Sequence, residues 1–78
     1  MDKSGIIDSI KLLTKDLIDI AAKHSVGQGV QADSLDSFES AFRFVQEHLL
    51  GAAGLTDAEK RDIARVLKDV KKVEDSYT

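Results

Sequence analysis

The chain of 78 residues contains no cysteine, no proline and no tryptophan. The lack of cysteine excludes disulfides, thiolate nucleophiles and thiolate zinc sites, and the lack of proline leaves nothing to kink a long helix. No apolar run is long enough to cross a membrane, and the first residues lack the basic and apolar parts of a secretion signal. We therefore expect a single soluble helical domain over residues 1–78, located in the cytoplasm.

Neither acidic nor basic residues are in large excess, because the formal net charge is only -3. This charge gives nucleic-acid phosphates no general attraction, so binding to DNA or RNA would need a concentrated basic patch. Hydrophobic residues make up 42% of the chain, which is too many for a disordered protein. The composition indicates an ordinary globular protein.

Three stretches carry apolar residues at spacings that alternate between three and four, which places one apolar stripe along each of three helices. The stripes are Ile6, Ile10, Leu13, Leu17 and Ile20; Leu35, Phe38, Phe42, Val45 and Leu49; and Ile63, Val66, Val70, Val73 and Tyr77. The spacing predicts an all-α, up-down-up three-helix bundle with short links and helices over about 4–24, 34–51 and 57–76. Longer helices that pair between chains as a coiled coil are the alternative.

Helix-capping and helix-breaking residues occur near these predicted limits. Gly27 and Gly29 interrupt the first apolar pattern, and Asp33 or Ser34 can cap the second helix. Thr56 and Glu59 have the spacing of a capping box at the start of the third helix.

Two large apolar residues fall outside the stripes. At about 100° per residue, Leu12 and Phe44 lie far around their helices from the stripe centres. We expect both to be exposed and to form part of a surface for a partner or a sister subunit, with His48 beside Phe44. Single exposed residues of no consequence are the alternative.

A basic ridge is expected on the third helix, because Arg61, Arg65, Lys68 and Lys72 recur at spacings of four, three and four. The ridge could orient an acidic partner, or it could be an ordinary solvated surface paired with nearby aspartates. No aromatic residue interleaves with it, so we do not expect nucleic-acid binding.

Neither of the two histidines belongs to a pattern that predicts a metal or catalytic site. His24 and His48 have no convergent carboxylates at metal-ligand spacing, and no serine can be matched with a base. We therefore predict no catalytic residue, no metal site and no enzymatic activity.

One segment, Ala32–Glu39, resembles a known family. Its Asp33-Ser34-Leu35 sequence is similar to the start of the second helix of acyl carrier proteins, whose Asp-Ser-Leu motif carries a phosphopantetheine arm on the serine. The resemblance implies a small helical carrier that would bind this cofactor through Ser34. The positive end of a helix dipole would suit the phosphodiester, but ordinary capping by Asp33 or Ser34 explains the same residues.

The sequence thus predicts a small non-enzymatic interaction or regulatory module that offers a helical surface to another protein or to its own copy. The partner-binding residues we expect are Leu12, Phe44, His48, Arg61, Arg65, Lys68 and Lys72. A carrier protein modified on Ser34 is the alternative function, and a nucleic-acid regulator is the third.

Overall fold

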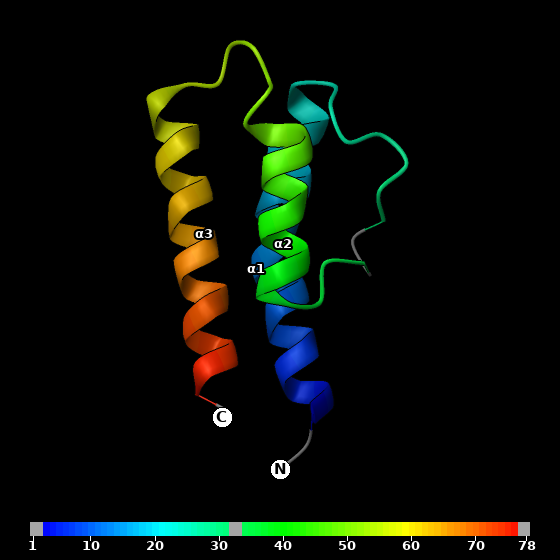
Figure 1. Ribbon diagram of the computed structural model, residues 1–78, viewed down its shortest axis with the longest axis vertical. Coiled ribbons are helices and arrows are strands. Elements are labelled where there is room, and N and C mark those ends of the chain that lie inside the picture. The colour runs from blue at the N-terminus through cyan, green and yellow to red at the C-terminus, as the bar shows by residue number, and fades with distance from the viewer. Residues whose placement is uncertain (1–2, 32–33, 77–78) are drawn as a thin grey trace.

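The computed structural model describes residues 3–31 and 34–76, and these residues form helices and loops without a strand. The helices are α1 (Lys3–Lys23), α2 (Phe38–Phe44), the π-helical turn η2 (Val45–Leu49) that continues it, and α3 (Asp57–Asp75). The protein is therefore an all-α three-helix bundle, as the apolar spacing predicts (Figure 1). Asp33 and Tyr77 lie outside the described residues.

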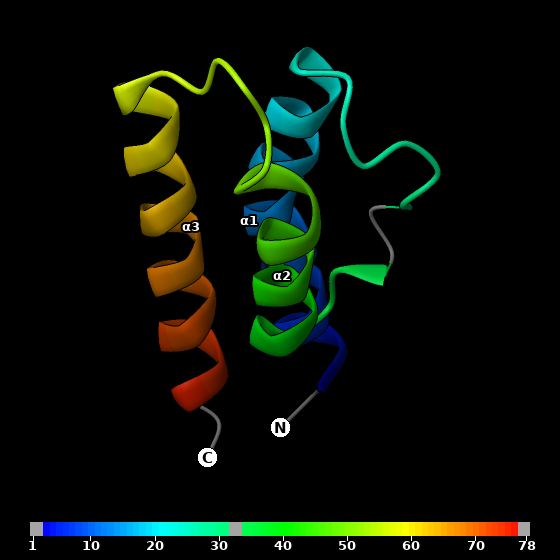
Figure 2. The ribbon, with the colours of Figure 1, turned by 45° about the horizontal axis from the view of Figure 1, so that its top comes forward.

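The topology differs from the up-down-up arrangement expected from the sequence. His24, just after α1, bonds to Glu59 near the start of α3, with His24 Nε2 2.9 and 3.0 Å from the two carboxylate oxygens. At the opposite end of the bundle, the backbone N–H of Phe38 donates to Glu74 Oε2 at 2.9 Å. Helices α1 and α2 therefore both run antiparallel to α3 and parallel to each other, which is an up-up-down order (Figures 1 and 2).

The length of the link between α1 and α2 permits this up-up-down order. Because α2 begins only at Phe38, residues 24–37 connect the two helices. Fourteen extended residues can span up to about 46 Å, more than the 41 Å length of the molecule, so this crossing segment can return along the bundle. A link of only a few residues would force neighbouring helices to run antiparallel, whereas fourteen residues also permit the parallel order seen here.

The crossing segment is part of the core. Leu35 is buried, and Val26 and Val30 pack against the core from the same segment. The buried Thr14 hydroxyl of α1 donates to the Leu35 carbonyl at 3.2 Å, and Lys11 O lies 3.1 Å away. The hydrogen bond to Leu35 ties the crossing segment to α1 at Thr14.

Helix α2 starts one turn later than expected because Ser37, not Ser34, is its N-cap. Ser37 Oγ accepts from the Ser40 N–H at 3.2 Å, and Ser40 Oγ accepts from the Ser37 N–H at 3.1 Å. This reciprocal capping box satisfies two backbone donors that would otherwise lack partners. The first and third helices agree with their predicted limits to within one residue at each end.

The prediction that Phe44 is exposed is wrong, because only 4% of its surface is accessible. Its ring lies under the crossing segment at Gly27, where an added Cβ would come within 2.9 Å of Phe44 Cε2. The positive φ of 66° at Gly27 also favours glycine. Phe42, which the sequence assigns to the core stripe, is instead 42% exposed.

The rotation of α2 has a simple physical cause. The apolar spacing suggests one buried stripe, but this helix is covered both by its neighbouring helices and by the crossing segment. Its buried arc therefore shifts toward Ala41 and Phe44 and leaves Phe42 at the edge.

The core itself draws on all three helices and on the crossing segment. Its buried apolar members are Ile10, Leu17, Ala21, Leu35, Ala41, Phe44, Val45, Leu49, Ile63, Val66 and Val70. In the described part of the chain, no buried side-chain nitrogen or oxygen lacks a hydrogen-bond partner. The apolar stripes are thus largely buried within one chain.

Glu59 makes two structural contacts at one end of the bundle. It bonds to His24, and it completes the predicted capping box with Thr56. The Thr56 N–H donates to Glu59 Oε1, and the Glu59 N–H donates to Thr56 Oγ1, each at 3.0 Å. The hydrogen bond from the Thr56 backbone and then that with His24 hold the pKa of Glu59 below its ordinary value of 4.5.

We expect this lowered pKa to make stability depend on acid pH. The charged carboxylate stabilises the fold above its ordinary pKa, and the contribution is lost as pH falls through the lowered value. Chemical unfolding of Glu59→Gln across pH should show a smaller loss of stability in acid than the wild type shows. Glu39→Gln, which removes an exposed carboxylate, should keep the wild-type profile, and identical profiles for all three proteins would contradict the assignment.

Candidate functional site

Four large apolar side chains remain exposed in the described part of the chain, namely Ile7, Leu12, Phe42 and Leu50. Leu50 is 68% exposed and lies where the chain leaves η2. It borders an open cleft of about 250 Å³ between the end of η2 and the first turns of α3. The cleft is lined by Leu50, Ala52, Gly54, Leu55, Lys60 and Ile63, and we call it the Leu50 cleft.

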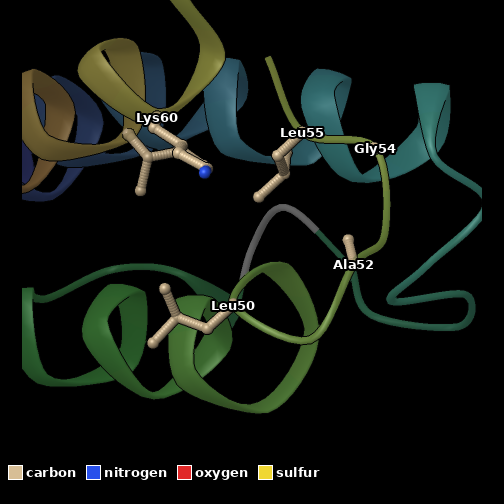
Figure 3. Close-up of a pocket in the computed structure, with 6 residues that line it drawn as sticks. Leu50, Ala52, Gly54, Leu55 and Lys60 are labelled. Atoms are coloured by element: carbon tan, nitrogen blue, oxygen red, sulfur yellow. The ribbon is translucent and has the colours of Figure 1, made fainter. Parts of the chain in front are cut away.

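The position of Leu50 follows from the π-helical turn. The Leu50 N–H donates to the Val45 carbonyl at 2.8 Å, five residues back, which makes the last turn wider than an α-helical turn. Val45 and Leu49 both face the core across this turn. Leu50 is therefore directed away from the core and into the cleft (Figure 3).

The opposite wall of the cleft is fixed by the start of α3. Gly54 has a φ of 89°, which glycine adopts without strain, and the capping box of Thr56 begins the helix two residues later. These features hold Leu55 and Lys60 across from Leu50. In Figure 3 the Leu50 and Leu55 side chains and the Lys60 ammonium group point into the same space.

Lys60 is the one charged residue among those that line the cleft. It is exposed, and its ammonium group makes no ion pair within 4.0 Å with any residue that the structure describes. The cleft can therefore accept an apolar group together with a neighbouring negative charge.

Apolar surface continues from the cleft along the seam between α2 and α3. The rings of Phe38 and Phe42 stack with centroids 5.8 Å apart, and Lys71 Nζ of α3 lies 5.4 Å from the Phe38 centroid. Eight residues separate Phe42 from Leu50, a rise of about 12 Å at helical geometry, and the wider π-helical turn of η2 between them turns Leu50 toward the side that carries Phe42. The two exposed side chains thus lie at successive levels of the same α2–α3 seam.

The residues predicted from sequence as one partner surface do not come together. Leu12 is 74% exposed on the outer side of α1, whereas Phe44 is buried in the core. His48 is half-buried against Phe44, with ring centroids 5.2 Å apart, and its Nε2 lies 4.0 Å from a Glu47 carboxylate oxygen. His48 thus lies beside Phe44 as expected, but because Phe44 is buried these residues do not form the apolar partner surface that the sequence predicts.

The basic ridge on α3 is exposed along its length, as the spacing indicates. Arg65 pairs with Asp16 of α1 at 3.7 Å and with Asp62 at 3.6 Å. Arg61, Lys68 and Lys72 make no ion pair within 4.0 Å in residues 3–31 and 34–76. The contact with Asp16 directs Arg65 toward α1, and none of the four ridge residues lines the Leu50 cleft.

Other kinds of site have no support in the described residues. They contain no group of three or more histidine, cysteine, aspartate or glutamate side chains that could hold a metal ion. Across the same residues, no helix has the length and apolar character needed to span a bilayer.

Leu50 and Lys60 were not predicted from the sequence, although one signal was present. Leu49 and Leu50 are adjacent, and neighbouring helical residues point about 100° apart, so a narrow core stripe buries only one of them. Lys60 carries no such signal, because its role depends on a cleft formed by residues from two elements.

Comparisons with known protein families, with curated proteins and with solved structures found no match to this chain. A functional assignment for this protein therefore rests on the geometry of its described residues.

Ser34, the residue that the carrier resemblance concerns, is exposed but lies three residues before the N-cap of α2. Its hydroxyl donates to the Gln31 carbonyl at 2.6 Å. The helix dipole that would favour a phosphodiester thus acts on Ser37 rather than on Ser34, because the effect falls off within the first turn.

We accordingly expect Ser34 to remain unmodified. Incubation with coenzyme A and a promiscuous phosphopantetheinyl transferase should leave the intact mass unchanged, while an acyl carrier protein in the same reaction gains one arm. Addition of one arm to the wild type, and its loss in Ser34→Ala, would establish the carrier function instead.

Proposed function

We propose that this protein is a non-enzymatic interaction module that binds a partner protein through the Leu50 cleft and the adjoining α2–α3 seam. The observation that carries the proposal is the exposure of Leu50 and Phe42 on one side of a bundle whose core is otherwise complete. Burying one such side chain in a partner interface is worth about 1.5–3 kcal/mol, which is enough for an anchor residue.

The cleft is also preformed, which lowers the cost of binding. Its two walls are held by the π-helical turn on one side and by the Thr56 capping box on the other. The ends of α3 are fixed by Glu59 and Glu74, which bond to His24 and to the Phe38 N–H. A partner therefore meets a surface that needs little ordering.

A displayed library of helical peptides tests this proposal. We expect selected binders to lose at least about tenfold in affinity for Leu50→Gln, because the anchor is removed. Leu12→Gln is the matched control, since it changes a more exposed leucine on another helix and should leave affinity unchanged. Both variants should fold with a free energy of unfolding within about 0.5 kcal/mol of wild type.

Two results would contradict the proposal. One is a library that yields no binder, and the other is a set of binders that lose affinity with Leu12→Gln but not with Leu50→Gln. The second result would place the partner surface on α1, where the sequence predicts part of it.

A further inference from the structure

The Leu50 cleft combines an apolar lining with a single cation, and this combination restricts what can occupy it. Leu50, Leu55 and Ile63 offer apolar contacts, while Lys60 brings a positive charge to the same space (Figure 3). A purely apolar occupant would partly desolvate the ammonium group without a partner, which is unfavourable. An occupant with a carboxylate beside its apolar group would satisfy both parts of the cleft.

A second cation lies farther along the same side of α3. Lys71 is eleven residues after Lys60, which places the two lysines about 16 Å apart and within about 20° of each other around the helix. Lys71 lies over the Phe38 ring and pairs with Asp75 at 3.6 Å, so Lys60 is the cation still available to a ligand. The seam thus has exposed Phe42 on α2, exposed Leu50 directly after η2, and two lysines on α3.

We propose that the occupant of the Leu50 cleft and the α2–α3 seam is an acidic amphipathic helix of a partner protein. Its apolar stripe would cover Leu50 and Phe42, and a glutamate or aspartate beside that stripe would pair with Lys60. This mode of recognition places an apolar helical face in a groove between two helices. The inference rests on the proposed function and adds the chemical character of the partner.

Two synthetic helical probes of about 18 residues, or about 27 Å, test the charge requirement directly. Both carry leucines seven residues apart to contact Leu50 and Phe42. The acidic probe has one glutamate on the edge of this stripe, level with the leucine that contacts Leu50 and opposite Lys60, and the neutral probe has glutamine there. Fluorescence anisotropy at low and high salt measures their affinities.

We expect the acidic probe to bind about tenfold more tightly than the neutral probe at low salt, with a smaller difference at high salt. Lys60→Gln should abolish this preference, and Lys60→Glu should reverse it. Lys72→Gln is the control, because it removes an exposed lysine that lies about 120° around α3 from Lys60 and should leave the preference intact.

The outcomes separate this inference from the proposed function. If both probes bind equally and Lys60→Gln changes nothing, the acidic character is wrong, while loss of binding in Leu50→Gln would still support the cleft as the site. If neither probe binds, the acidic helix is overturned whatever the peptide library yields. Dimerisation that blocks the acidic probe, measured by light scattering, would identify a second copy as the occupant and overturn the inference as well.

Discussion

The burial of Phe44 beneath the segment that returns from α1 to α2 is the contact on which the rest of the structure depends. Gly27 allows this segment to approach the ring so closely that a Cβ there would lie 2.9 Å from Phe44 Cε2. With Phe44 buried, α2 is rotated so that Phe42 is exposed beside α3. The surface available to a partner is thus a consequence of how the link between the first two helices packs.

Helix α3 then connects the two parallel helices through polar contacts at opposite ends. Glu59 bonds to His24 at one end, and Glu74 accepts from the Phe38 N–H at the other. Both contacts join a carboxylate of α3 to a group at the end of a neighbouring helix, so they help to fix the antiparallel direction of α3. The Leu50 cleft lies at the Glu59 end, where the wall formed by α3 is held by this contact and by the Thr56 cap.

The sequence was sufficient to predict the elements but not their arrangement. The first and third helices follow from uninterrupted apolar spacing, and the Thr56 capping box was correctly predicted from two residues. The direction of α2 was not predicted, because the apolar pattern does not show that the link between α1 and α2 returns along the bundle. Phe44 was predicted to be exposed for the same reason, because the sequence does not show that the crossing segment covers it. The Leu50 cleft could not be predicted because its lining residues come from separate elements.

The most direct test of this packing compares Phe44→Leu with Phe42→Leu in the free energy of unfolding, measured by denaturant titration. We expect Phe44→Leu to lose about 1 kcal/mol or more, because the ring fills a packed position between α2 and the crossing segment. Phe42→Leu should lose less than about 0.5 kcal/mol, because its ring is already partly in solvent. An equal or larger loss for Phe42→Leu would contradict the burial of Phe44 under the crossing segment and, with it, the position of the candidate site.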